Sequence, residues 1–362
     1  MLLPLILTVA LSPCEQSSAF AAAYRQGSDT SATLATRRSG YENAIATCRG
    51  DVRPYRELAA LLLANRLFGP ALAWLEKGLV VSPNDPELRV QQAAALVPLN
   101  KPKQALAALD SIASPEASFY RGMSFRLLQD HKQARDCFSK SWNSGFKNPY
   151  VLYSLIQEEY VLHEKQSGLE HFELLLKTYP DSAWVHLLLA DAYFAKEQND
   201  QAQAEYEKAL AQKPDVLGAN FRLGYIAFQT GHRESAARYF RNEITLNPNY
   251  PDAHMFLAEC LLELDRTSEA IEQFRAVLAI DDHSGLAYKR LATLLTETNQ
   301  LAQAKTELSK AASIFPTDPS FPAQLAHVLT LMNEPKEAEV AAARARTLTA
   351  EQHRDHEALL KK

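Results

Sequence analysis

Apolar residues recur at helical spacing along most of the chain, in pairs of stripes separated by a short polar segment. In residues 183–216, Leu187 and Ala190 belong to the first stripe, and Ala202 and Tyr206 belong to the second. The segment "KEQND" between the stripes is polar, and "KPD" ends the second stripe because proline cannot continue a helix. The pattern predicts a hairpin of two helices joined by a turn.

This hairpin pattern repeats every 34 residues. Prolines follow the second stripe at Pro180, Pro214 and Pro248, and again two intervals later at Pro316. Small residues keep the same interval at Ala134, Gly168, Ala202, Ala236, Ala270, Ala304 and Ala338. A bulky residue stands four positions after the first six of these, at Phe138, Phe172, Tyr206, Phe240, Phe274 and Leu308. Several residue types held in one register indicate a repeat architecture.

The repeat resembles the tetratricopeptide repeat family, whose 34-residue pattern has small residues at positions 8, 20 and 27, a bulky residue at 24 and proline at 32. Residues 183–216 match this pattern with Ala190, Ala202, Tyr206, Ala209 and Pro214. Residues 217–250 match it with Gly224, Ala236, Phe240 and Pro248, and Gly231 is expected to make the turn. The second match is incomplete, because Glu243 stands at position 27.

The resemblance implies an all-α fold, a right-handed α-solenoid of stacked helix–turn–helix hairpins. One hairpin cannot bury its apolar face alone, so neighbouring hairpins must stack. We expect about nine units over residues 52–348, at 52–85, 86–114, 115–148, 149–182, 183–216, 217–250, 251–284, 285–318 and 319–348. Residues 22–51 are expected to form an N-terminal helical segment or an eroded repeat, and residues 349–362 a C-terminal capping helix.

The resemblance also implies a concave groove, lined by positions 2, 5, 9 and 12 of each first helix. These positions are aromatic in the central units and more polar toward the flanks. The residues proposed for a partner-binding groove stand at these positions and are Phe119, Arg126, Tyr150, Tyr153, Gln157, Tyr160, Trp184, Asp191, Phe194, Phe221, Tyr225, Phe228, Glu259 and Lys289. An aromatic stripe with few charges favours a protein or peptide surface. The alternative is that several of these rings only pack between adjacent first helices.

Composition and motifs argue against other classes of function. The 362-residue chain has a net charge of −5, unlike the basic surface that nucleic-acid binding requires. Nucleotide-binding, hydrolase and zinc-protease motifs are absent from the sequence, and the repeats leave no stretch of the size of a catalytic domain. His353 and His356 fit a charged helical tail better than a metal site. We expect no enzymatic activity, no cofactor and no metal.

The N-terminus resembles a secretory signal peptide. The apolar run from Leu2 to Leu11 is too short to span a bilayer, and Ala19-Phe20-Ala21 matches an A-x-A cleavage pattern. We expect cleavage after Ala21, export to the periplasm or medium, and no transmembrane anchor thereafter. The alternatives are a lipid anchor at Cys14 and a cytoplasmic chain with an uncleaved start.

The four cysteines, Cys14, Cys48, Cys137 and Cys260, are far apart and show no CxxC spacing. This spacing predicts neither a zinc site nor a disulfide scaffold. Cys14 is expected to leave with the signal peptide, and the other three are interpreted as small apolar core residues.

These observations predict a non-enzymatic scaffold or adaptor of the bacterial cell envelope that binds a protein or peptide partner in an aromatic groove. The alternative within this class is a regulatory or assembly subunit of an envelope, polysaccharide-export or secretion complex, acting through its convex face. A third hypothesis, less favoured, is an enzyme with unrecognised chemistry.

Overall fold

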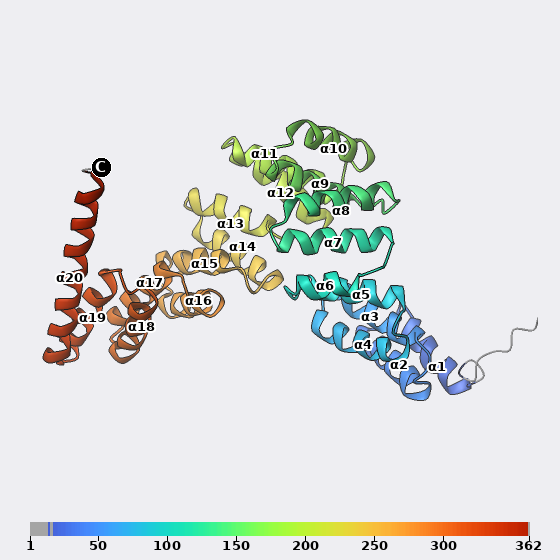
Figure 1. Cartoon of the computed structure of the whole chain (residues 1–362), viewed down its shortest axis with the longest axis horizontal. Helices are drawn as coiled ribbons and strands as arrows, with labels where there is room; N and C mark the ends of the chain where they lie inside the picture. The colour runs from blue at the N-terminus through green and yellow to red at the C-terminus, as the bar shows by residue number, and fades with distance from the viewer. Residues whose placement is uncertain (1–13, 15–16, 361–362) are drawn as a thin grey trace, which may run out of the picture. The chain divides into compact units, whose positions relative to one another are not determined.

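The structure, a computed structural model, describes residue 14 and residues 17–360, and within them it contains twenty α-helices and no strand (Figure 1). The chain forms two compact units, Met1–Pro180 and Asp181–Lys362. Each unit is a stack of helical hairpins. The predicted all-α hairpin repeat is therefore confirmed.

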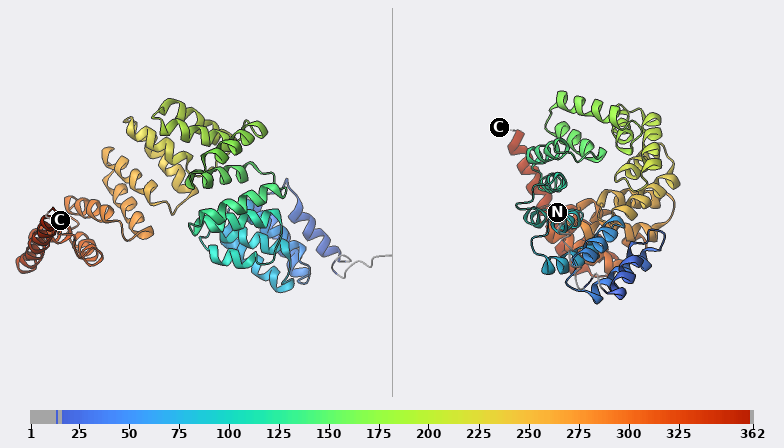
Figure 2. Two further views of the ribbon diagram at one scale, coloured as in Figure 1. Left: turned by 45° about the horizontal axis from the view of Figure 1, so that its top comes forward. Right: turned by 90° about the vertical axis from the view of Figure 1, so that its right-hand side faces the viewer.

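The first unit consists of the helices α1 to α10. Each odd-numbered helix packs against the next even-numbered one, and α2, α4, α6 and α8 each pack against the helix that opens the next hairpin (Figure 2). The helices are α1 (Ser18–Ser28), α2 (Leu34–Thr47), α3 (Arg53–Ala64), α4 (Phe68–Val81), α5 (Pro86–Leu96), α6 (Pro102–Ala108), α7 (Pro115–Leu127), α8 (His131–Asn143), α9 (Pro149–Val161) and α10 (Lys165–Thr178).

The second unit repeats the same arrangement with α11 to α20. Its helices are α11 (Ala183–Ala195), α12 (Asn199–Gln212), α13 (Ala219–Gln229), α14 (Arg233–Leu246), α15 (Pro251–Glu263), α16 (Thr267–Ile280), α17 (Gly285–Glu297), α18 (Leu301–Ile314), α19 (Ser320–Leu331) and α20 (Pro335–Leu360). The last helix is continuous over 26 residues, so the described part of the expected capping segment prolongs it.

The 34-residue period is also present in the backbone. A residue in the turn after the first helix of the hairpin has a positive φ at Arg66, Asn100, Gln129, His163, Glu197, Gly231, Asp265, Asn299 and Asn333. This left-handed residue lets the chain reverse and satisfies the last helical carbonyls. In the turn at Gly231, the amide of His232 donates to the carbonyl of Ala227 at 2.8 Å. The turn expected at Gly231 is therefore confirmed.

The core lies between the two helices of each hairpin and between successive hairpins. The small and bulky repeat positions that are fully buried are Ala134, Ala202, Ala236, Ala270, Ala304, Phe138, Tyr206, Phe240, Phe274 and Leu308. Gly168 and Phe172, in α10, are only half-buried. The expected core positions are confirmed at each of these hairpins except the one that contains α10.

Glu243, the residue that departs from the repeat pattern, has a local structural role. Its side chain is only 1% exposed, and its carboxylate accepts the amides of Gly218 at 2.9 Å and Phe221 at 3.4 Å. Gly218 has a φ of +85° and precedes α13, where amide groups lack helical partners. A carboxylate at a helix N-terminus satisfies these amides and the positive end of the helix dipole.

Cys14 and Cys48 form a disulfide, with their Cα atoms 5.7 Å apart. The prediction that these cysteines are unpaired is wrong, because α1 and α2 bring together two positions that are remote in sequence. Of the other two, Cys260 is buried and Cys137 is half-buried. Burial raises the pKa of the Cys260 thiol to about 11, as expected for an unreactive core cysteine.

The N-terminal segment is described only in part. Residues 1–13, 15 and 16 of the expected signal peptide lie outside the described residues. The bond after Ala21 lies inside α1, in its first turn. Within the described chain, none of the helices combines the length and apolar character needed to cross a membrane.

Candidate functional site

The fourteen residues expected to line a groove fall in both units. Those in the first unit are Phe119, Arg126, Tyr150, Tyr153, Gln157 and Tyr160, on α7 and α9. Those in the second unit are Trp184, Asp191, Phe194, Phe221, Tyr225, Phe228, Glu259 and Lys289, on α11, α13, α15 and α17. Each set is described within its own unit.

Two candidates in the first unit have structural roles. Phe119 is buried, with its ring centroid 5.7 Å from that of Phe138. Arg126 forms an ion pair with the buried Glu158, donates to the carbonyl of Ser154 at 2.8 Å, and lies 4.9 Å from the ring of Phe138. A guanidinium engaged in this way holds α7 against α9.

The remaining candidates of the first unit lie along α9. Tyr150 and Tyr153 are half-buried and stacked, with ring centroids 5.9 Å apart, and Gln157 follows on the same side of the helix. Burial raises the pKa of the Tyr150 hydroxyl. Tyr160, at the end of α9, is 79% exposed.

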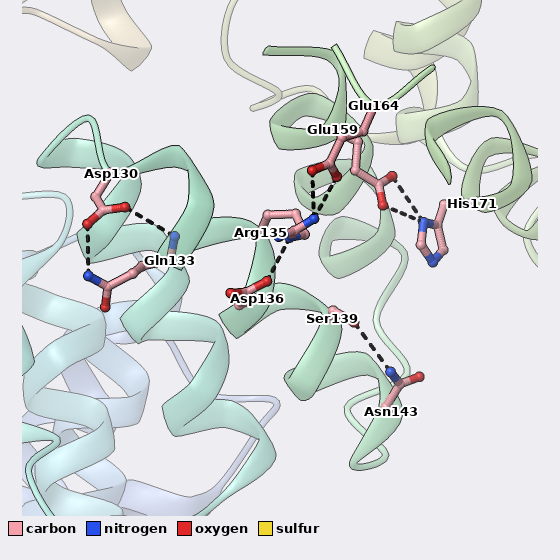
Figure 3. Close-up of polar contacts among 9 residues, drawn as sticks. All are labelled: Asp130, Gln133, Arg135, Asp136, Ser139, Asn143, Glu159, Glu164 and His171. Atoms are coloured by element: carbon pink, nitrogen blue, oxygen red, sulfur yellow. Dashed lines mark hydrogen bonds and ion pairs between the residues drawn. The ribbon is translucent and has the colours of Figure 1, made fainter. Parts of the chain in front are cut away.

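Helices α8, α9 and α10 carry a set of charged pairs (Figure 3). The carboxylate of Glu159, which is buried, contacts Nδ1 of His171 at 2.9 Å. Arg135 donates to Glu164 at 2.6 Å. The hydrogen bond with Glu159 raises the pKa of His171 and outweighs the opposing effect of its partial burial. These pairs connect successive helices, and we assign them a structural role.

The second unit contains a continuous aromatic cluster on α11, α13 and α15. Tyr225 is its centre, with ring centroids 6.0 Å from Phe194 and 5.3 Å from Phe256. Phe228 also contacts Phe256, at 5.5 Å. Phe221 is only 8% exposed and lies beneath the others, 4.9 Å from Tyr250. Phe194, Tyr225 and Phe228 are half-buried, so each presents part of its ring to solvent.

A pocket of about 610 Å³ opens beside this cluster. Its lining residues are Phe194, Ala195, Glu197, Asn199, Phe221, Arg222, Tyr225 and Gln229. The turn between α11 and α12 provides Glu197, and Asn199 is the first residue of α12. The first helix of the next hairpin, α13, provides the residues from Phe221 to Gln229. Three of these residues are aromatic and four are polar or charged, so the pocket offers both apolar and polar contacts.

The charges around the pocket are arranged around Arg222. This residue is exposed, and its guanidinium lies 5.1 Å from the ring of Phe194. Within the described chain, Arg222 forms no ion pair. Burial raises the pKa of nearby Asp191, whose carboxylate accepts the Tyr206 hydroxyl at 2.5 Å. The positive charge of Arg222 opposes this rise in the Asp191 pKa, and Glu197 provides a negative charge at the pocket.

The other candidates of the second unit flank this pocket. Glu259 pairs with Arg290 at 3.0 Å. Lys289 pairs with Asp318 at 3.0 Å, and its ammonium lies 5.2 Å from the ring of Phe321. Trp184 is half-buried on α11. Glu259 and Lys289 therefore join neighbouring hairpins through ion pairs.

Several residues of this surface were not expected from the sequence. Phe256, Glu197, Asn199, Arg222 and Gln229 fall outside the positions assigned to the groove. The turn residues could have been found from the 34-residue period, because Glu197 occupies the same turn position as Gly231. Phe256 carries no such signal, since its role depends on contact with the preceding hairpin.

Comparisons with known proteins agree with the repeat. The tetratricopeptide repeat family model matches residues 166–221, 227–295 and 262–323. A comparison with curated protein sequences finds no match. Among solved structures, a crystal structure of MamA protein is 17% identical, covering 48% of this chain and 94% of that one with a TM-score of 0.43. A second crystal structure of MamA is 18% identical, with coverages of 46% and 97% and a TM-score of 0.42. The tetratricopeptide repeat family model therefore matches hairpins between residues 166 and 323 of this chain.

Proposed function

We propose that the second unit binds a segment of a partner protein at the aromatic surface formed by Phe194, Tyr225 and Phe228, together with the pocket beside it. Tetratricopeptide repeats support a protein-interaction scaffold, and their fold is typically non-catalytic. The observation that carries the choice of site is the pocket itself, which joins half-buried rings to the exposed Arg222. Aromatic residues and arginine are the side chains that most often dominate protein interfaces.

The chemistry of the pocket indicates what kind of segment it would take. A volume of about 610 Å³ accommodates one or two large side chains. The rings of Phe194 and Tyr225 favour an apolar or aromatic side chain of the partner, which would lose its contact with water there. Arg222 favours a carboxylate next to that side chain, and Asn199 and Gln229 offer amides for the backbone of an extended segment.

We further propose that the protein acts as a non-enzymatic adaptor after export to the cell envelope. The apolar N-terminal run supports export, and so does the Cys14–Cys48 disulfide, because disulfides persist in oxidising compartments. The proposed activity needs no cofactor. The partner remains defined by its chemistry, an apolar side chain followed or preceded by an acidic one.

Affinity purification with matched variants tests the proposal. The full-length protein, a Tyr225→Ala/Phe228→Ala variant and a Tyr150→Ala/Tyr153→Ala variant are each used to capture partners from an extract of cells that make the protein. The second pair is the control, because it removes half-buried rings from α9 in the first unit. Circular dichroism and thermal melting establish that each variant is folded.

We expect the α13 variant to lose a partner that the wild type and the α9 variant both retain. An Arg222→Glu variant removes no buried ring, and we expect it to weaken binding about tenfold, equivalent to ~1.4 kcal/mol. Unchanged recovery with a folded α13 variant would refute the proposed site. Loss of the partner with the α9 variant alone would place the site in the first unit instead.

A further inference from the structure

Helix α1 is an integral part of the first unit. Phe20, in its first turn, is only 4% exposed, and its ring centroid lies 5.8 Å from that of Tyr24. Tyr24 in turn contacts the buried ring of Tyr41 on α2 at 5.7 Å. The guanidinium of Arg53, at the start of α3, lies 5.8 Å from the Phe20 ring. The first turn of α1 therefore contributes to the core and reaches the next hairpin.

The crossing of α1 and α2 depends on two glycines. A Cβ on Gly40 would collide with the backbone of Gly27, and a Cβ on Gly27 would lie 2.5 Å from the ring of Tyr41. Arg37 on α2 also donates from Nε to the carbonyl of Gly27 at 3.1 Å. The two helices can therefore approach this closely only where both residues lack a side chain, because protein interiors have little free space.

The chain just before α1 is tied to both helices. Ser17 caps α1 by accepting the amide of Phe20 at 3.2 Å, and its own amide donates to the carbonyl of Cys14 at 3.2 Å. Cys48 ends α2, where its amide donates to Ala44 at 2.9 Å. The Cα separation of 5.7 Å between Cys14 and Cys48 is within the range of native disulfides.

We propose that the mature protein retains Cys14 in a disulfide with Cys48, and that any removal of the leader takes place upstream of Cys14. Cleavage after Ala21 would remove Cys14, the Ser17 cap and the Phe20 ring. Cys48 would then be a single thiol, and Tyr24 and Arg53 would lose the ring that they contact. A lipid on the Cys14 thiol is incompatible with the same bond, because one sulfur cannot carry both.

Formation of the Cys14–Cys48 disulfide requires an oxidant. The Cys14 and Cys48 thiols together lose two protons and two electrons as the sulfur–sulfur bond forms. A disulfide-exchange oxidoreductase accepts them, and its own disulfide is reduced to two thiols. This exchange takes place in an oxidising compartment, which is also where a leader would be removed.

Counting alkylated cysteines tests the proposal. The full chain, with its own N-terminus, is expressed in a bacterial host and recovered from the periplasmic and cytoplasmic fractions. Each sample is denatured and alkylated before and after reduction, and its intact mass and N-terminal peptide are measured. We expect periplasmic protein that begins at or before Cys14, with two cysteines alkylated before reduction and four after it, because Cys137 and Cys260 are free.

The other outcomes each overturn the proposal. Three alkylated cysteines in both states, with Ala22 at the N-terminus, would show cleavage inside α1. Three in both states with a mass increase on Cys14 would show lipidation. Four alkylated cysteines in both states of the periplasmic protein would show that the bond does not form. A Cys48→Ser variant is the control, and we expect it to have the same N-terminus and three alkylated cysteines in both states.

Discussion

Glycine at two repeat positions allows an aromatic ring from the second helix of the hairpin to approach the first. A Cβ on Gly122 would lie 2.6 Å from the ring of Phe138, and a Cβ on Gly224 would lie 2.7 Å from the ring of Phe240. Both rings are fully buried. The absence of a side chain at Gly122 and Gly224 therefore sets how closely the two helices of each hairpin pack. Because Phe138 and Phe240 are fully buried, neither ring can move into solvent to make room for a methyl group.

Gly224→Ala is expected to lower the free energy of unfolding by about 1–3 kcal/mol, because the added methyl group overpacks the contact with Phe240. The measurement is a guanidinium chloride unfolding curve. Gly69→Ala is the matched control, since no heavy atom lies within 4 Å of a Cβ built at Gly69 in α4. Gly69→Ala is expected to raise the free energy of unfolding by up to ~1 kcal/mol, because alanine has a higher helix propensity than glycine. Equal effects of the two changes would contradict the proposed packing.

His171 on α10 links the stability of the first unit to pH. Its folded pKa is raised because protonated His171 hydrogen-bonds to the carboxylate of Glu159. The other groups that influence it are the carboxylate of Glu170 and the backbone of Ser167. The stabilisation is fully present below the unfolded histidine pKa, near 6.5, and is lost as pH rises through the raised folded pKa.

We therefore expect His171→Gln to lower the melting temperature at pH 6 and to have a smaller effect at pH 9. The measurement is a series of thermal melts between these values. In a Glu159→Gln background the same histidine change should show little dependence on pH, because the carboxylate that binds the protonated ring is gone. If His171→Gln lowers the melting temperature equally at pH 6 and pH 9 in the otherwise wild-type protein, His171 does not link stability to pH.

Helices of the same length differ in how they are held in place. Helix α16 buries five side chains, whereas α10 fully buries only Leu175 and leaves Leu169 and Leu176 exposed. Polar contacts provide much of the attachment of α10, including the Tyr179 hydroxyl bond to the Lys147 carbonyl at 2.7 Å. At α13 a buried carboxylate from another helix, that of Glu243, caps the first turn.

Glu243→Ala is expected to destabilise the second unit by about 1–2 kcal/mol, because the amides of Gly218 and Phe221 lose their acceptor. Glu243→Gln keeps one acceptor oxygen, and we expect it to cost less. Chemical denaturation measures both effects, and hydrogen exchange shows whether the loss is at the start of α13. An alanine variant as stable as the wild type, with unchanged exchange in α13, would show that Glu243 is not a cap.

At the scale of the whole molecule, the hairpins could be predicted from the sequence because their spacing repeats in several residue types. Ala202, Ala236 and Ala270 keep that spacing through helices of different composition. The division near Pro180 has no such signal, since the period continues across it. The Cys14–Cys48 pair was missed because Cys14 was assigned to a leader on local pattern alone.

The candidate site was predicted only in part, for a physical reason. Repeat position indicates which side of a helix a ring occupies, but its exposure depends on the neighbouring hairpin. Phe221 and Tyr225 are one helical turn apart, yet the rings of Tyr250 and Phe256 cover the first and leave part of the second accessible. Residues such as Tyr225 therefore remain candidates for binding, whereas Phe221 supports the surface from below.

Site-specific photo-cross-linking tests the central claim most directly. A photoreactive phenylalanine derivative replaces Gln229, at the rim of the pocket, and in a separate control it replaces Val80 on α4, which is 82% exposed. After illumination with the partner recovered by affinity purification, mass spectrometry maps the attached segment. We predict cross-links from position 229 to one partner segment that contains an apolar and an acidic side chain, and none from position 80. Cross-links from position 80 without any from position 229 would contradict the claim.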